Sequence, residues 1–313
     1  MRTSTATFLA SDGAPLHVFT WMPDASVEVR AVAHIGHGMA EHAGRYARFA
    51  QTLTAQGYVV HAHDHRGHGR TARPEDLGHF GESGWPRVVQ DFRELLYREL
   101  AEHAGLPFVL FAHSMGSYMA QELLFDMSDR FAAVVLSGSN GKPAPIAAAG
   151  RVVARAEKLR VGARGASPIL SALSFEAFNK KFAPNRTACD WLSRDTAEVD
   201  AYVADPLCGF ACSTTTWIGL LDALAHIANP TLQARIRPDL PVYVVAGKED
   251  PVSDETAGLE RLLAAYERAG LRDVTHRFYD GARHEILNET HRDEVTRDLI
   301  AWLSTKVHYS SRR

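Results

Sequence analysis

The sequence has little cysteine, no marked excess of charge of either sign and no long apolar run. Its 313 residues include three cysteines, 34 lysines and arginines, and 37 aspartates and glutamates, for a formal net charge of −3. Three cysteines (Cys189, Cys208 and Cys212) are too few for a disulfide framework, which predicts free thiols in a reducing cytoplasm. A nearly balanced charge gives no electrostatic reason to bind nucleic acid.

Targeting and membrane-spanning signals are also lacking. No stretch approaches the roughly 18 apolar residues that span a bilayer. Asp12 interrupts the N-terminal segment MRTSTATFLASDG before it reaches the apolar length of a signal peptide. The chain has neither an internal repeat nor a low-complexity tract. We therefore expect a cytoplasmic protein whose membrane contact is at most peripheral.

Short apolar segments alternate with amphipathic ones along most of the chain. An opening hairpin is expected at residues 5–22, and helical spacing recurs at 44–57, 85–105, 115–126, 254–269 and 292–306. Strands are expected between these helices, within 29–35, 58–64, 107–113, 131–139, 240–250 and 274–285. Alternation of buried strands with amphipathic helices predicts an α/β fold with a mainly parallel, doubly wound sheet.

The alternation stops after Asn140 and resumes after Ile227. The residues between are rich in alanine, helical in pattern and dotted with aromatics. The simplest organisation is one α/β core, residues 1–139 and 228–313, with a helical insertion at 140–227.

The segment FVLFAHSMGS, residues 108–117, joins a strand to a helix through a serine. It resembles the G-x-S-x-G nucleophile elbow, in which a sharp turn exposes the serine above the sheet. Gly116 supplies the second glycine, and Ala112 stands in place of the first. The alternative is that Ser114 merely caps the helix that follows it.

A serine nucleophile needs a base, and the base needs an orienting acid. In α/β-hydrolases these follow the serine in the order acid, then histidine. Five histidines follow Ser114: His226, His276, His284, His291 and His308. His284 alone lies on a short glycine-bearing loop after a strand. The preceding strand ends in GKEDPVS, where Asp250 is preferred to Glu249 because Pro251 fixes the turn. We predict a Ser114–His284–Asp250 triad.

Two backbone N–H groups are predicted to form the oxyanion hole. One belongs to Met115, directly after the serine, and the other to Met39 in the early loop HGMAEH. The alternative is that Gly36 and Gly38 only turn the chain.

Seven histidines gather early in the chain: His34, His37, His42, His61, His63, His65 and His68. They suggest a metal site, but none of the usual spacings such as H-E-x-x-H is present. We predict no metal. Instead these histidines should pack the rim of the active site, with Asp64 and Arg66 fixing their loop.

The motifs HGMAEHAGRYARFAQTLTAQGYVVHAHDHRGHGRT, HSMGS, GKEDPVS and GARHEILNE resemble the monoacylglycerol lipase and lysophospholipase group of serine hydrolases. The resemblance extends from about Thr7 to Leu303. It implies an α/β-hydrolase core, a helical cap, no cofactor and hydrolysis of small-molecule acyl esters. Residue by residue, it assigns the nucleophile, acid, base and oxyanion donors as above, and places Glu41 and Arg45 near the polar head of a bound monoglyceride.

The cap of that group resembles SRDTAEVDAYVADPLCGF, which contains Leu207. Phe175, Phe178 and Phe182 precede it with helical spacing. They either line an acyl site or only dock the insertion on the core. We expect Phe178 and Leu207 to contact substrate.

Two departures from the group's pattern bear on function. Ala112 replaces the elbow glycine, as it does in related lipases. Leu287 stands where some monoacylglycerol lipases carry a glycerol-contacting histidine, and HEILNE is more similar to bacterial lysophospholipase-type members. A peptidase, amidase or lactonase could use the same triad, and a non-catalytic ligand-binding protein is the remaining alternative.

Overall fold

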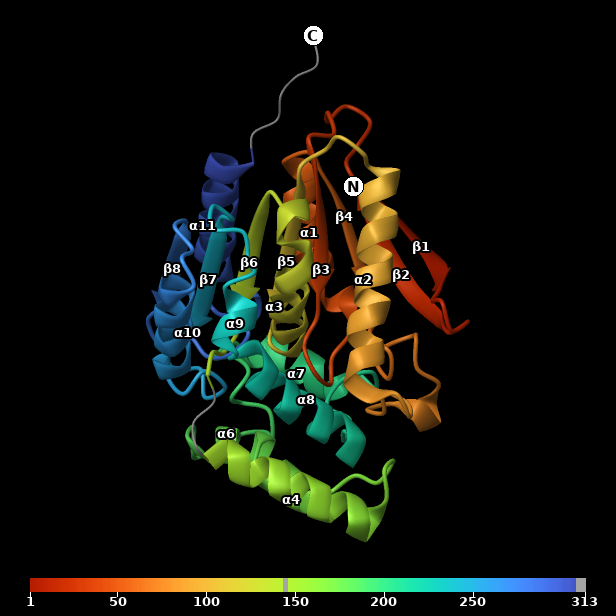
Figure 1. The fold of residues 1–313 in the computed structure, drawn as a ribbon, viewed down its shortest axis with the longest axis vertical. Coiled ribbons are helices and arrows are strands. Elements are labelled where there is room, and N and C mark those ends of the chain that lie inside the picture. Colours follow the sequence, from red (N-terminus) through yellow and green to blue (C-terminus); the bar gives the residue numbers. More distant parts are fainter. Residues whose placement is uncertain (143–145, 308–313) are drawn as a thin grey trace.

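A computed structural model describes residues 1–142 and 146–307. Its centre is an eight-stranded sheet in the order β1-β2-β4-β3-β5-β6-β7-β8 (Figure 1). β1 and β2 form the predicted antiparallel hairpin, β2 pairs antiparallel with β4, and the remaining pairs are parallel. The strands are β1 (Arg2–Leu9), β2 (Pro15–Met22), β3 (Ala31–Gly36), β4 (Tyr58–His63), β5 (Phe108–His113), β6 (Ala133–Ser137), β7 (Val242–Gly247) and β8 (Val274–Tyr279).

Helices cover both faces of the sheet. The core helices are α1 (Ala47–Ala55), α2 (Gly84–Glu102), α3 (Met115–Met127), α9 (Pro230–Gln233), α10 (Ala257–Arg268) and α11 (Arg292–Lys306). Short 3-10 turns occur at η1 (Ala43–Tyr46), η2 (Pro74–Asp76), η3 (Ser128–Arg130) and η4 (Ile286–Asn288). This arrangement confirms the predicted α/β fold with a mainly parallel, doubly wound sheet.

Two apolar cores lie on opposite faces of the sheet. Along β5, Phe108, Leu110 and Ala112 pack with α2 and α3, whereas Val109 and Phe111 pack with α1 and α11. Alternate residues of a strand point to opposite faces, so a strand covered on both sides must be apolar throughout. This explains why the central strands appear in the sequence as continuous apolar runs.

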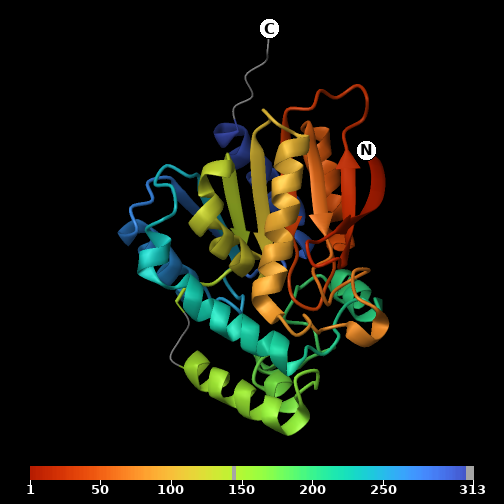
Figure 2. The same ribbon diagram turned by 45° about the vertical axis from the view of Figure 1, so that its right-hand side comes forward.

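Residues 146–227 form five helices at the carboxyl end of the sheet, at the bottom of Figures 1 and 2. They are α4 (Ile146–Val161), α5 (Pro168–Ala172), α6 (Phe175–Lys180), α7 (Thr196–Ala204) and α8 (Thr214–Ile227). α8 contacts both the core and the rest of the insertion. Its Trp217, Leu220 and Ala223 join the apolar core of α2 and α3, and α4 packs against it. Of the described helices, none combines the length and apolar character needed to cross a membrane.

Two predicted helices differ in extent from the structure. Asp254, Glu255 and Thr256 have φ values of 55°, 53° and 79°, so α10 begins only at Ala257. Left-handed backbone cannot continue a right-handed helix. α6 ends at Lys180, so Phe182 lies beyond it, although Phe175, Phe178 and Phe182 still meet in one cluster around Trp191.

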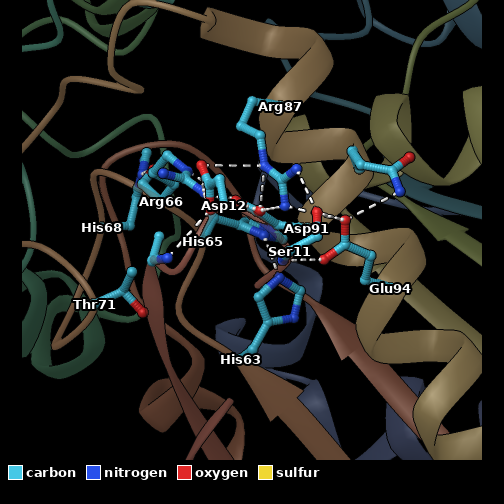
Figure 3. Close-up of polar contacts among 12 residues, drawn as sticks. Ser11, Asp12, His63, His65, Arg66, His68, Thr71, Arg87, Asp91 and Glu94 are labelled. Carbon is cyan, nitrogen blue, oxygen red and sulfur yellow. Dashed lines mark hydrogen bonds and ion pairs between the residues drawn. The ribbon is translucent and has the colours of Figure 1, made fainter. Parts of the chain in front are cut away.

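The loop after β4 is tied to α2 and to the opening hairpin by charged side chains (Figure 3). Asp91 of α2 accepts hydrogen bonds from Arg66 and Arg87, at 2.8 Å for each Nε. Arg66 also pairs with Asp12 in the hairpin turn. Asp64 accepts from the backbone N–H groups of Ala43 and Arg70. These contacts confirm the prediction that Asp64 and Arg66 fix this loop.

Candidate active site

Ser114 sits at a strained turn between β5 and α3. Its backbone has φ 50° and ψ −122°, a conformation that side chains other than glycine rarely adopt. The Ser114 N–H donates to the Ser137 carbonyl at 2.8 Å, which anchors the turn to the end of β6. A Cβ at Gly116 would lie 2.5 Å from the His37 carbonyl oxygen, so only glycine fits there. The turn thus has the geometry of a nucleophile elbow.

Ala112 is accommodated without distortion. It is fully buried and pairs with Gly36 in the neighbouring strand β3. Its methyl group packs in the core formed with α2 and α3. The extra methyl relative to glycine therefore fills core space and does not intrude on Ser114.

The loops after β7 and β8 approach each other closely because of Gly247. A Cβ at this position would lie 2.1 Å from the Ala282 carbonyl oxygen. The Glu249 N–H donates to the same carbonyl at 2.9 Å. The close approach at Gly247 brings Asp250, three residues further along, beside His284.

Ser114, His284 and Asp250 form one hydrogen-bonded line. His284 Nε2 lies 2.9 Å from Ser114 Oγ, and His284 Nδ1 lies 2.9 and 3.0 Å from the two oxygens of Asp250. Asp250 is fully buried and His284 nearly so, while Ser114 is half-buried. The other candidate histidines lie elsewhere: His226 in α8, His276 in β8 and His291 before α11, with His308 outside the described residues.

Two rings pack against the His284 imidazole, and sequence reasoning missed their role. The ring centroid of His113, at the end of β5, lies 4.7 Å away, and that of Trp191, in the insertion, lies 5.1 Å away. Gly138, with φ 53°, permits this packing, because a Cβ there would lie 2.9 Å from His113 and 3.0 Å from His284. Burial lowers the pKa of His113 to about 4, so this neighbour is neutral.

The activity should show a shifted acid limb in its pH profile. Burial acts to lower the pKa of His284, but the negative charge of Asp250 and its hydrogen bond outweigh burial and hold that pKa above its ordinary value. His284 is the base predicted from the sequence, and a base must be unprotonated, so a raised pKa would mean that activity is lost at higher pH than for an unperturbed histidine. We expect kcat/KM for a neutral ester to fall below an apparent pKa above about 6.5. A limb centred below that value would contradict this assignment.

The loop after β3 approaches Ser114 and is pinned from several sides. A Cβ at Gly38 would lie 3.2 Å from Ser114 Cβ, so this glycine directly adjoins the serine. Ala40, with φ 56°, turns the chain, and its carbonyl accepts from the Tyr202 hydroxyl at 2.8 Å and from the Gly209 N–H at 2.9 Å. Both donors come from the insertion. Among the described residues, neither the Met39 N–H nor the Met115 N–H donates to a protein acceptor, so both are free for a ligand oxygen.

Glu41, Arg45 and Glu285 form a buried charge cluster beside this loop. Arg45 donates to Glu41 at 2.7 Å and makes a two-pronged contact with Glu285 at 2.6 and 2.7 Å. Glu41 Oε1 also accepts from the Gly38 N–H at 2.6 Å. Burial opposes ionisation, yet the Arg45 guanidinium holds the pKa of both carboxyls below their usual range. In the structure the polar groups of Glu41 and Arg45 are thus engaged by protein partners.

Arg45→Met should lower the free energy of unfolding by about 3–5 kcal/mol, because it leaves two buried carboxylates without their cation. Urea denaturation measures this change. Arg48→Met, one helical turn further along, is the control. Arg48 is half exposed and pairs with Glu198, so its loss should cost less than about 1 kcal/mol. Equal losses of unfolding free energy in the two variants would show that the buried cluster stabilises the fold no more than an exposed ion pair does.

Phe178 and Leu207, the two predicted substrate contacts of the insertion, have different surroundings. Phe178 packs on Trp191 at 5.4 Å between ring centroids, one side chain away from His284. Leu207 is half-buried in the loop after α7, where its N–H donates to Asp205. Glu285 was missed as a site residue, although its place directly after His284 in the sequence was the available signal.

One group of side chains has the composition of a metal site. Ligand atoms of His42, Asp205 and Cys208 lie within 4.8 Å of one another. However, His42 Nε2 and the Asp205 carboxylate bond to each other at 2.9 Å, and burial raises the pKa of the Cys208 thiol well above its ordinary value. A protonated thiol is a poor ligand, so the group is better described as a hydrogen-bonded pair joining the early loop to the insertion.

Comparison with known proteins agrees with this geometry. A family model described as serine aminopeptidase, S33, matches residues 27–291. The chain is 32% identical over 309 residues to a monoacylglycerol lipase of Mycolicibacterium smegmatis, covering 96% of each. It is 28% identical over 308 residues to human monoglyceride lipase, covering 95% of this chain and 89% of the relative. A Bacillus coagulans carboxyl esterase solved with glycerol has a TM-score of 0.89 at 24% identity, covering 98% of this chain and 100% of its own.

The sheet order and the serine elbow define an α/β-hydrolase. Within that fold, the chain belongs to the serine aminopeptidase S33 family. It is a carboxylic ester hydrolase similar to monoacylglycerol lipases.

Proposed function

We propose that the chain hydrolyses monoacylglycerols, lysophospholipids and similar acyl esters through an acyl-enzyme formed on Ser114. The observation that carries this proposal is the hydrogen-bonded line from Ser114 Oγ through His284 to Asp250. A hydroxyl within 2.9 Å of an imidazole nitrogen can lose its proton to it as the oxygen attacks a carbonyl carbon.

In this mechanism Ser114 Oγ attacks the ester carbonyl while His284 Nε2 takes the hydroxyl proton. The carbonyl oxygen becomes an oxyanion, which the N–H groups of Met39 and Met115 stabilise. His284 then protonates the leaving alcohol as the ester bond breaks. Water attacks the acyl-enzyme with His284 again as base, which releases the fatty acid and restores Ser114. Asp250 holds the proton on Nδ1 throughout and stabilises the imidazolium.

The insertion is proposed to act as a cap that selects substrate. Residues 140–227 would form this cap over a core of residues 1–139 and 228–313. Phe178 and Leu207 would meet the acyl chain, while Glu41 and Arg45 would frame the polar head through the loop they hold. Leu159 and Leu173 are 91% and 61% exposed on the insertion, so any membrane contact would be peripheral and through this part.

The supporting observation for an acyl-ester substrate is full-length similarity to proteins named as monoacylglycerol lipases. We also propose a cytoplasmic location on the basis of the three free thiols. No bound cofactor takes part in the proposed steps.

A substrate panel tests the proposal. Purified protein is assayed on monoacylglycerols and lysophospholipids of increasing acyl length and, in parallel, on aminoacyl arylamides. We expect hydrolysis of the esters, with kcat/KM dependent on acyl length, and much slower cleavage of the arylamides. Faster cleavage of the arylamides would assign the site to peptide or amide bonds instead.

A further inference from the structure

We propose that a buried chain of hydrogen bonds orients the peptide that presents the Met39 N–H. We call this chain the histidine relay, and its members are side chains with at most 2% exposure: Glu99, His34, His63, His65 and His37. It starts on α2, crosses β3 and β4, and ends in the loop beside Ser114. The inference rests on the oxyanion role proposed above for Met39.

Each link of the relay is at hydrogen-bond distance. Glu99 Oε2 lies 2.7 Å from His34 Nδ1, and His34 Nε2 lies 3.0 Å from His63 Nδ1. His63 Nε2 lies 3.0 Å from His65 Nδ1, a contact visible in Figure 3. His65 Nε2 lies 3.1 Å from the His37 carbonyl oxygen. One unbroken line therefore connects helix α2 to the loop.

Backbone groups fix the proton positions at the loop end. The His65 backbone N–H donates to His37 Nε2 at 2.9 Å, so that nitrogen carries no proton. His37 must then carry its proton on Nδ1, which lies 2.8 Å from the Gly38 carbonyl oxygen and donates to it. A carbonyl oxygen only accepts, so His65 must carry a proton on Nε2 to bond the His37 carbonyl.

These two anchors determine every other proton in the relay. Burial lowers the pKa of His34 to about 3 and those of His63 and His65 far below the ordinary value, so each ring is neutral with one N–H. His65 Nδ1 must accept from His63 Nε2, and His63 Nδ1 must accept from His34 Nε2. His34 Nδ1 is then a bare acceptor facing the carboxyl group of Glu99.

Glu99 must therefore donate its own carboxyl proton. Burial raises its pKa to about 7, while nearby His61, His103 and Arg98 lower it and Glu102 raises it. The second carboxyl oxygen, Oε1, is buried and has no partner among the described residues. An unpartnered oxygen costs far less on a neutral acid than on a carboxylate. Geometry and environment thus agree on a protonated acid at the head of the relay.

The consequence concerns the direction of one N–H group. The Gly38–Met39 peptide is trans, so its C=O and N–H point in opposite directions. The His37 Nδ1–H holds the Gly38 carbonyl on one side, and the Met39 N–H is therefore directed to the other. If the relay reversed, His65 Nε2 would face the His37 carbonyl as a second acceptor, and the bond that holds the preceding His37–Gly38 peptide of the same loop would be lost. The proton on Glu99 opposes this reversal, because a reversed relay would turn the His34 Nδ1–H toward it.

Histidine tautomers of the resting protein test the relay without reference to activity. Long-range ¹⁵N–¹H correlation spectra of ¹⁵N-labelled protein should show a protonated Nδ1 at His37 and a protonated Nε2 at His34, His63 and His65. The opposite tautomer at His65 would overturn the proposal. Because no substrate is present, this result stands whether or not the proposed hydrolysis is correct.

Two variants of Glu99 then separate positioning from simple packing. In Glu99→Gln an amide N–H can replace the acid proton toward His34, so kcat should stay within about twofold of the parent. Glu99→Leu removes the donor, and kcat should fall about tenfold with KM unchanged, a fraction of the 10²–10³-fold cost of losing an oxyanion donor outright. Leu96→Ala, a cavity variant in the same helix, is the stability control and should leave kcat unchanged.

The comparison is made at a temperature where all variants are folded, as shown by their thermal unfolding. Equal kcat losses in Glu99→Gln and Glu99→Leu would overturn the proposal. So would a Glu99→Leu protein with unchanged kcat and an unchanged His65 tautomer.

Discussion

Ser114→Ala is expected to abolish ester hydrolysis, with kcat falling by about 10⁴- to 10⁶-fold. The variant loses Ser114 Oγ, which lies 2.9 Å from His284 Nε2. What remains is binding and the stabilisation of the oxyanion by backbone N–H groups, which still leaves slow hydrolysis by water. Saturating p-nitrophenyl ester assays measure the loss, and labelling by a fluorophosphonate probe should disappear with it.

Folding and labelling controls accompany this variant. Ser304→Ala removes a hydroxyl from α11 that donates to the helix carbonyl of Ala301, so activity and labelling should be unchanged. Thermal unfolding of Ser114→Ala should be close to that of the parent, because the half-buried Ser114 side chain adds little packing. Near-normal ester hydrolysis by Ser114→Ala would rule out an acyl-enzyme mechanism on Ser114.

Much of the site follows from the order of segments along the chain. The carboxyl ends of parallel strands meet at one edge of a sheet, so loops after such strands converge even when they lie far apart in the sequence. Ser114, Asp250 and His284 each follow a strand, and the structure places them in one hydrogen-bonded line. The local pattern also predicted that helices cover both faces of the sheet, because the central strands are apolar at almost every position.

The contacts that surround this line could not be predicted from the sequence. Arg45 meets Glu285 across 240 positions, and Glu99 meets His34 across 65. Neither pair has a local spacing, because their contact depends on how helices and loops pack over the sheet. The early histidines were expected to pack the rim of the site. The common direction in which the histidine relay donates its hydrogen bonds depends on the exact register of β3 and β4. The start of α10 was predicted three residues too early, because three residues with positive φ precede the helix.

Asp250→Asn should reduce kcat by about 10³- to 10⁴-fold through the wrong histidine tautomer. The Val252 N–H donates to Asp250 Oδ1 at 2.9 Å, so in the variant the amide oxygen should occupy that position. The amide nitrogen then takes the place of Oδ2, 3.0 Å from His284 Nδ1. There it donates to Nδ1 and favours the tautomer protonated at Nε2, which faces Ser114 as a donor and cannot accept its proton.

A second measurement distinguishes this mechanism from misfolding. Removing the negative charge of Asp250 removes what holds the His284 pKa above its ordinary value, so the acid limb of the residual activity should move to lower pH. Asp254→Asn, in the same loop but with a side chain 62% exposed, is the matched control and should keep both rate and pH profile. A rate loss below about tenfold in Asp250→Asn, or an unmoved acid limb, would mean that Asp250 neither fixes the tautomer nor stabilises the imidazolium. In that case Glu285 and Glu41, whose charges also raise the His284 pKa, would have to supply the stabilisation instead.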